Sequence, residues 1–258
     1  MIEKILSTTF IRTLRDVLIF RLSTGQAIVV GCDSTGGIGP KKLDKVNVDG
    51  YTLGRFTARV ALMEVLSTGA EPFCIVNTLS VEPRPTGNEI MKGVKHEVRL
   101  AGLDPRVAMV GSSEKNIPVE QTGVGVTALG IAKTGSLKIG VSRAGDAVAA
   151  IGVPCAGREV IQAEKEKRIA EIEDLLKLLK LKFVHEVIPV GSKGILYEAK
   201  TIAKESNLKL QLAEKSRLDL KKSAGPATVI LTSLASSKVI RLREIVKKPV
   251  SVVGHLVQ

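Results

Sequence analysis

The sequence predicts an α/β protein of two domains in which helices cover β-sheets. In the first half of the chain, stretches rich in β-branched residues alternate with stretches of helical periodicity. The alternation restarts after Thr134, Gly135 and Ser136, which places a domain boundary between residues 1–135 and residues 136–258. No dinucleotide-binding glycine fingerprint accompanies this pattern, so an α/β sandwich is favoured over a Rossmann domain.

The first domain is predicted to contain a β-hairpin, because two β-branched runs at 17–20 and 27–32 flank a Ser-Thr-Gly turn. Residues 52–68 place apolar side chains at helical spacing and end at Gly69, a common helix C-cap. The remaining elements expected here are strands at 73–79, 107–110 and 123–131 and a helix over about 87–101.

The second domain is predicted to follow the same alternation. A charged stretch with regularly placed leucines predicts one long helix over residues 157–180. The other elements expected are a helix over 195–206 and strands at 147–153, 184–190, 227–231 and 250–253.

Composition indicates a folded protein without a membrane anchor. The chain has 258 residues, of which 44% are hydrophobic, enough to build cores. No apolar run approaches the roughly 20 residues that span a bilayer, and the N-terminus lacks the order of a signal peptide, so a cytoplasmic location is expected. The three cysteines, Cys32, Cys74 and Cys155, lack metal-site spacing and are expected to be buried, reduced thiols.

The net charge of +12 raises the possibility of nucleic-acid binding. Residues 1–135 carry a net charge of +3 and residues 136–258 carry +9, where the bases alternate with acids as on a solvated helix face. Aromatic residues make up 3% of the chain and Trp is absent, so stacking platforms for single strands are scarce. Nucleic-acid binding therefore ranks below the other functions.

The segment VGCDSTGGIGP, residues 30–40, carries the clearest chemical signal. Gly36, Gly37 and Gly39 free the backbone to bring N–H groups close to an anion, and Asp33 can hold Mg²⁺ at the end of a strand. Lys41 follows directly and can neutralise phosphate charge. An exposed turn capped by an aspartate explains the same local sequence equally well.

Further acids favour the phosphate interpretation. Asp16 comes just before a strand, and Glu114 follows a Gly-Ser-Ser loop after another strand. Glu64 lies within an otherwise apolar helix, where an inward-facing acid requires a cation or a hydrogen-bond partner. A surface position for Glu64 is the alternative. Several carboxylates beside glycine turns suit phosphoryl transfer, in which metal ions and amides spread the charge.

Other polar residues carry weaker signals. His96 shares a helix face with lysines and an arginine, which indicates an exposed basic face, and His185 and His255 have no evident partner. The segment 191–194, GSKG, opens a helix and can either bind an anion or simply cap the helix. Asn77 and Asn116 are candidate substrate contacts.

Several blocks resemble the AIR synthase (PurM-like) superfamily, which includes thiamine-monophosphate kinase. They are CDSTGGIG at 32–39, ARVALMEVLSTGAEP at 58–72, VGSSEKN at 110–116 with QTGVGVTALG after it, and GDAVAAIGVPCAG at 145–157. VIPVGSKGILYEA at 187–199 and SAGPAT at 223–228 are similar to the α-ribazole kinase-like branch. Together these blocks span nearly the whole chain.

The resemblance implies a PurM-like fold and a homodimer whose N-terminal sheets pair into a barrel, with ATP near the interface and a C-terminal domain covering the site. It implies that Asp16, Asp33, Glu64 and Glu114 bind Mg²⁺, with Asp33 and Glu64 central to catalysis. The residues expected to contact the nucleotide are Gly36, Gly37, Gly39, Lys41, Gly111, Ser112 and Ser113. Where thiamine-monophosphate kinase has Gly-Asp-Thr, this chain has Ser-Ser-Glu at 112–114, so its carboxylate is displaced by one residue.

These observations predict an ATP-dependent kinase that transfers the γ-phosphoryl group to a nucleoside-like small molecule, with α-ribazole as the leading acceptor. Alternatives are thiamine-monophosphate phosphorylation or another reaction of the superfamily, an ATP-binding module that has lost catalysis because its acids are few, and a nucleic-acid-binding protein.

Overall fold

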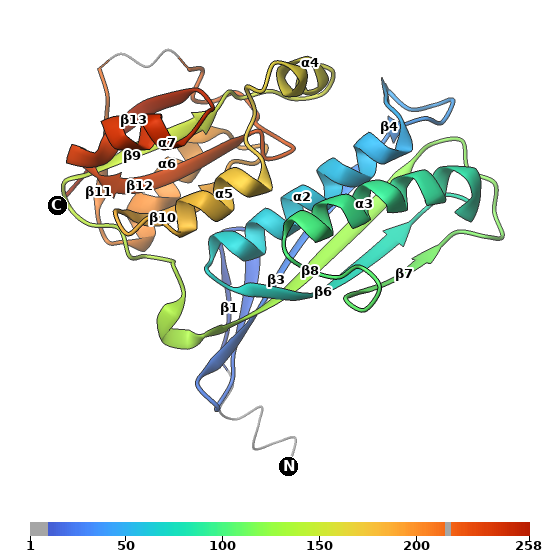
Figure 1. Ribbon diagram of the computed structural model, residues 1–258, viewed down its shortest axis with the longest axis horizontal. Coiled ribbons are helices and arrows are strands. Elements are labelled where there is room, and N and C mark those ends of the chain that lie inside the picture. Colours follow the sequence, from blue (N-terminus) through green and yellow to red (C-terminus); the bar gives the residue numbers. More distant parts are fainter. Residues whose placement is uncertain (1–9, 215–217) are drawn as a thin grey trace. The chain divides into compact units, whose positions relative to one another are not determined.

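The structure, a computed structural model, describes residues 10–214 and 218–258. The chain divides after Leu137 into two compact units, unit 1 and unit 2 (Figure 1). The sequence places the boundary after residue 135, beside this division. Each unit is a β-sheet with helices packed on it, so the predicted α/β class is confirmed.

Unit 1 is built on a six-stranded sheet in the order β1-β2-β3-β8-β6-β7. All neighbours are antiparallel except β6 and β7, which are parallel. The strands are β1 Phe10–Leu14, β2 Val17–Arg21, β3 Gln26–Gly36, β6 Glu71–Leu79, β7 Met109–Ser113 and β8 Gly123–Lys133, and a small parallel pair joins β4 Ile38–Gly39 to β5 Val46–Asn47. The predicted hairpin is β2–β3, whereas β1 was not expected.

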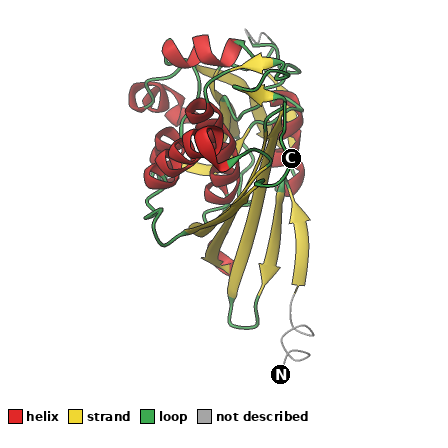
Figure 2. Ribbon diagram, turned by 90° about the vertical axis from the view of Figure 1, so that its right-hand side faces the viewer, coloured by secondary structure: helices red, strands yellow, loops and turns green. Residues whose placement is uncertain are grey.

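Two helices of unit 1, α2 (Gly50–Ser67) and α3 (Asn88–Leu100), lie side by side on one face of this sheet (Figures 1 and 2). The helix predicted over 52–68 is therefore confirmed as α2. The Asp49 side chain caps its first turn by accepting a 2.6 Å hydrogen bond from the Thr52 N–H. A short π-helical turn, η1 (Pro83–Gly87), leads into α3, and a 3₁₀ turn, η2 (Thr134–Ser136), follows β8.

The two faces of the unit 1 sheet differ in burial. On β3, the odd-numbered residues Ala27, Val29 and Gly31 are buried, while the even-numbered residues alternate with them on the opposite face. That second face, here called the outer face, carries apolar residues in register across four strands, and these are only partly buried. One such row is Leu18, Val30, Leu129 and Cys74.

Unit 2 is a five-stranded antiparallel sheet in the order β10-β12-β9-β13-β11. Its strands are β9 Asp146–Gly152, β10 Val184–Pro189, β11 Lys209–Leu212, β12 Val229–Ala235 and β13 Val250–Val257. Its helices are α4 Glu159–Lys165, α5 Ile172–Leu179, α6 Ile195–Glu205 and α7 Val239–Ile245, with the 3₁₀ turn η3 Ser236–Lys238. The fully buried Val148, Ile188 and Ile202 belong to its core.

The long helix predicted over residues 157–180 is wrong, because two short helices, α4 and α5, replace it. Lys167 has a positive φ of 56°, which ends the helical path. Ile169 and Ala170 then lie fully buried, and the Ala170 N–H donates to the Thr228 carbonyl at 2.9 Å. Tertiary contacts with the sheet thus override the local periodicity.

The cysteine expectation is partly wrong. All three are free thiols, but Cys32 is exposed and Cys74 half-buried, and only Cys155 is buried. Cys32 is exposed because the alternation of β3 turns it to the outer face. Among the described residues, no helix has the length and apolar character needed to cross a bilayer.

Candidate active site

The predicted glycine turn, residues 36–39, forms one wall of a cavity of about 470 Å³ within unit 1. The cavity is lined by Gly36, Gly37, Ile38, Lys45, Val46, Ser80, Val119, Gln121, Thr122 and Gly123. The lining combines glycine backbone, hydroxyl and amide groups with one lysine, and its volume is in the range typical of small-ligand sites.

Asp44 holds the turn in shape. Its carboxylate accepts hydrogen bonds from the Lys41 N–H at 2.8 Å, the Thr122 N–H at 2.8 Å and the Thr122 hydroxyl at 2.6 Å. The N–H groups of Lys45 and Val46 both donate to the Gly37 carbonyl. These hydrogen bonds fix the conformation of the turn.

Asp33 and Glu64 lie on the helix-facing side of the sheet. Thr35, two residues beyond Asp33, bonds the Thr57 hydroxyl of α2 at 2.9 Å, so the alternation of β3 directs Asp33 toward α2 as well. A Cβ built on Gly31 would lie 3.1 Å from the Glu64 Cβ. Gly31 therefore gives Glu64 room against β3, two residues from Asp33.

Asp16 lies in the turn between β1 and β2, directly before Val17, which pairs with Gly31. The Asp16 backbone therefore lies one strand away from Gly31 and Asp33. Asp16 is exposed, whereas Glu64 is 6% exposed and buried within α2. The alternative of a surface position for Glu64 is excluded by this burial.

Burial raises the pKa of Asp33 from 3.8 to about 6, and a hydrogen bond from the Ser34 N–H offsets part of that effect. Among the described residues, no cation offsets the effect of burial on the Asp33 carboxyl. Binding of a metal ion or another cation beside this carboxyl stabilises its ionised form and lowers its pKa.

Glu114 occupies a different part of the sheet. Ser113, which precedes it, pairs with Leu79 of β6, and β7 is three strands from β3, a separation of about 14 Å. The Glu114 carboxylate accepts the N–H groups of Asn116 at 2.7 Å and Ile117 at 3.1 Å, and these bonds lower its pKa. Glu114 therefore caps its own loop. Gly111 and Ser112, which are predicted to contact the nucleotide, lie on the edge strand β7 that precedes this loop.

The donor set fits a magnesium ion that is bound mainly through substrate phosphates. Among residues 10–214 and 218–258, no three acidic, histidine or cysteine side chains are grouped to hold a metal by themselves. Mg²⁺ commonly binds through one or two carboxylates, with phosphates and waters completing its shell. Asp33, with Glu64 or Asp16, supplies that number.

Lys41, for which a contact with phosphate is predicted, has a partner within the protein. Its ammonium forms an ion pair with Glu82, and the same carboxylate accepts the Thr86 hydroxyl. These bonds lower the pKa of Glu82, against the effect of its burial. Lys41 thus ties the glycine turn to the segment that follows β6.

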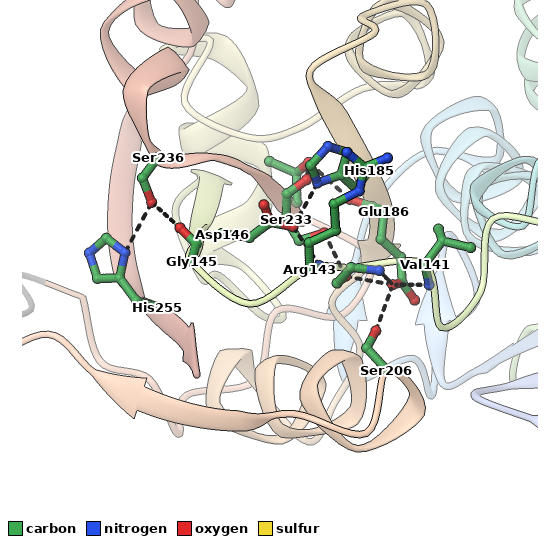
Figure 3. Close-up of polar contacts among 12 residues, drawn as sticks. Val141, Arg143, Gly145, Asp146, His185, Glu186, Ser206, Ser233, Ser236 and His255 are labelled. Atoms are coloured by element: carbon green, nitrogen blue, oxygen red, sulfur yellow. Dashed lines mark hydrogen bonds and ion pairs between the residues drawn. The ribbon is translucent and has the colours of Figure 1, made fainter. Parts of the chain in front are cut away.

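In unit 2, two histidines gain partners that the sequence did not reveal (Figure 3). His185 lies at a β-bulge of β10, and its Nδ1 is 2.7 Å from Asp146 Oδ2. The adjacent Glu186 is fully buried and accepts N–H bonds from residues 140–142. His255 lies 3.3 Å from the Ser236 hydroxyl. These contacts anchor the start of unit 2 to its sheet.

Residues 14–132 match the family described as AIR synthase related protein, N-terminal domain. This region is similar to that family and is here called the AIR synthase-related domain. It contains the glycine turn, Asp16, Asp33 and Glu64, and most of the outer face. A search of curated protein sequences finds no match.

Solved structures extend the likeness over both units. AaThiL complexed with AMPPCP and TMP is 14% identical, with a TM-score of 0.65 over 94% of this chain and 84% of that one. Thiamine-monophosphate kinase from Stenotrophomonas maltophilia K279a is 15% identical, with a TM-score of 0.62 over 97% and 89%. Hydrogenase maturation protein HypE in complex with ATP is 15% identical, with a TM-score of 0.62 over 89% and 76%. The chain therefore has the PurM-like fold.

Sequence reasoning missed Lys45, Ser80 and Gln121, which line the cavity. Lys45 carried a usable signal, since it follows the glycine turn closely in sequence. Ser80 and Gln121 reach the cavity only through strand pairing, because the Ser80 N–H donates to the Gly123 carbonyl. No local pattern in the sequence predicts that meeting.

Proposed function

We propose that this protein is an ATP-dependent phosphotransferase acting on a small molecule. The observations that support this most are the glycine turn with a cavity beside it, and Glu64 facing β3 two residues from Asp33, within the AIR synthase-related domain. Solved proteins of the same fold are bound to ATP or to AMPPCP. A carboxylate site for a metal ion and a rigid loop for phosphate are two parts that phosphoryl transfer uses.

In this proposal Asp33 and Glu64 hold Mg²⁺, with Asp16 at the exposed side. When bound, Mg²⁺ neutralises charge on the transferring phosphoryl group. The glycine turn positions the triphosphate, and Asp44 keeps the turn rigid so that little ordering is needed on binding. Gly111, Ser112, Ser113 and Glu114 lie across the sheet, and they enter the site only if the ligand extends to β7.

We propose α-ribazole as the acceptor, on the strength of the sequence blocks at 187–199 and 223–228. Purified protein would be incubated with ATP, Mg²⁺ and either α-ribazole, thiamine monophosphate or adenosine, and phosphorylated products would be measured by mass spectrometry. A phosphorylated α-ribazole product, formed much faster than the others, is expected. Equal ADP formation with and without α-ribazole would remove this acceptor while leaving ATP use in place.

We also propose that the protein works as a cytoplasmic homodimer that pairs two outer faces. The row Leu18, Val30, Leu129 and Cys74 is apolar and only partly covered, and Val110 on β7 is 60% exposed. A broad apolar sheet face on a folded domain usually has a partner. A second candidate function, ATP binding without turnover, is favoured by the separation of Glu114 from the other acids.

A further inference from the structure

Three segments of unit 2 meet at one end of its sheet. They are residues 143–145 before β9, residues 180–183 between α5 and β10, and residues 236–241, which form η3 and the start of α7. The Ser236 hydroxyl donates a 2.6 Å hydrogen bond to the Gly145 carbonyl (Figure 3). The Ala235 N–H donates to the Phe183 carbonyl at 3.1 Å. The three segments are therefore neighbours, although they lie far apart in sequence.

These segments carry five cations and no acidic residue. The cations are Arg143, Lys180, Lys182, Lys238 and Arg241, all of them exposed, and they are here called the basic end of unit 2. The adjacent acid, Asp146, is 3% exposed. Its carboxylate accepts the Arg143 N–H at 2.9 Å and lies 2.7 Å from His185 Nδ1. Asp146 is therefore engaged inside unit 2 and is not available to the exposed cations.

The cations of the basic end differ from several other exposed cations of unit 2, which have carboxylate partners. Arg168 pairs with Glu166 at 2.5 Å, and Lys222 pairs with Glu159 at 2.6 Å. Within residues 10–214 and 218–258, none of the five cations of the basic end forms an ion pair. An acidic partner that binds there has no intramolecular carboxylate to displace.

An apolar side chain lies among these cations. Ile240 is 72% exposed and comes between Lys238 and Arg241, whereas Leu242 of the same helix is fully buried. Protein interfaces combine apolar contacts with charged groups around them. Phosphate contacts, which supply most of the affinity for nucleic acids, make no use of an isoleucine. One exposed apolar side chain is also too little to anchor a helix in a membrane. The combination favours a protein partner.

We propose that the basic end of unit 2 is a docking surface for an acidic segment of a partner protein. Lys238 and Arg241 bind carboxylates of that segment, and Ile240 contacts one of its apolar side chains. Exposed cations on neighbouring segments attract and orient an acidic partner, and salt weakens that attraction. The surface belongs to unit 2, so this proposal does not depend on the proposed reaction.

The test is binding of labelled acidic peptides to the full-length protein, measured by fluorescence anisotropy at low and high salt. One peptide has glutamates around two leucines, and the other has serines in place of the leucines. Duplex DNA and phosphatidylserine vesicles are the comparison probes. The variants are Lys238→Glu with Arg241→Glu, and Ile240→Ser. Lys165→Glu with Lys200→Glu is the matched reversal of two exposed cations of unit 2 outside the basic end. Thermal melts of every variant report whether the fold is kept.

The wild type should bind the leucine peptide at low salt, and more tightly than the serine peptide. Lys238→Glu with Arg241→Glu should weaken this binding about tenfold or more, and the matched reversal should change it by less than about twofold. Ile240→Ser should remove the preference for leucine. An equal loss in the two charge-reversed proteins would overturn the proposal, because it would show attraction to net charge alone. Tighter binding of DNA or vesicles than of the leucine peptide, or no peptide binding by the wild type, would overturn it as well.

Discussion

At the scale of single residues, the candidate site contains polar groups that are buried among apolar neighbours. Asp33 has a raised pKa because it is half-buried. Asn77 is 3% exposed, and among the described residues its Oδ1 has no hydrogen-bond partner. Asn77 and Asp33 both pair with Val126 of β8, so the two polar groups lie on one row of the sheet.

Replacing Asp33 by Asn tests how much the buried, ionised carboxyl lowers the free energy of unfolding. The pKa of Asp33 is higher in the folded chain than in the unfolded one, so its stabilising protonated form is fully present below about pH 4 and is lost as the pH rises through 6. Asp33→Asn should therefore raise the free energy of unfolding by about 2 kcal/mol at pH 8 and leave it nearly unchanged at pH 4. Denaturation of both proteins at the two pH values measures the difference, and equal differences at both would contradict the assignment.

At the scale of elements, α2 and α3 pack closely because glycines lie at their crossing. A Cβ on Gly54 would lie 2.0 Å from the Ile90 carbonyl oxygen, and one on Gly93 would lie 2.0 Å from the Tyr51 carbonyl oxygen. Beside this crossing, the buried Glu97 accepts hydrogen bonds from Arg55 and Arg59. The closeness of the two helices thus depends on the absence of two side chains.

Gly54→Ala should destabilise the protein by about 3 kcal/mol, because the methyl group meets backbone atoms that cannot move aside without separating the helices. Gly135→Ala is the matched control, since a Cβ there meets nothing within 4 Å. Urea denaturation monitored by circular dichroism would measure both. A loss at Gly54 no larger than that at Gly135 would show that the helices are less closely packed than described.

Elements that are determined by local sequence signals could be predicted from the sequence. The hairpin β2–β3 and the helix α2 follow from β-branched runs, a turn and a C-cap glycine, which are local signals. The break between α4 and α5 within residues 157–180 could not be predicted from local signals. The path of the chain there depends on a hydrogen bond from the Ala170 N–H to the Thr228 carbonyl, far along the sequence. The site divides similarly: Asp33 and the glycine turn are visible in the sequence, whereas the meeting of Lys45, Ser80 and Gln121 depends on strand pairing.

At the scale of the whole molecule, the outer face of the unit 1 sheet is the proposed dimer interface. Val30→Lys places a charge in the middle of its apolar row and should convert the dimer to a monomer, because an unpaired charge in such an interface is costly. Thr24→Lys, in the exposed turn between β2 and β3, is the control. Sedimentation would give the masses, and the exposed Cys32 should react with a thiol reagent faster in the Val30→Lys protein. A wild type that sediments as a monomer at micromolar concentration would contradict the dimer.

The central claim is that the AIR synthase-related domain holds a magnesium-bound triphosphate at Asp33 and the glycine turn. Calorimetric titration of the wild type and Asp33→Asn with the ATP analogue AMPPCP, with Mg²⁺ and with EDTA, tests it most directly. The account predicts saturable binding by the wild type in Mg²⁺, binding at least about tenfold weaker in EDTA, and little effect of Mg²⁺ on Asp33→Asn. Absence of binding by the wild type, or binding of equal strength with and without Mg²⁺, would contradict it.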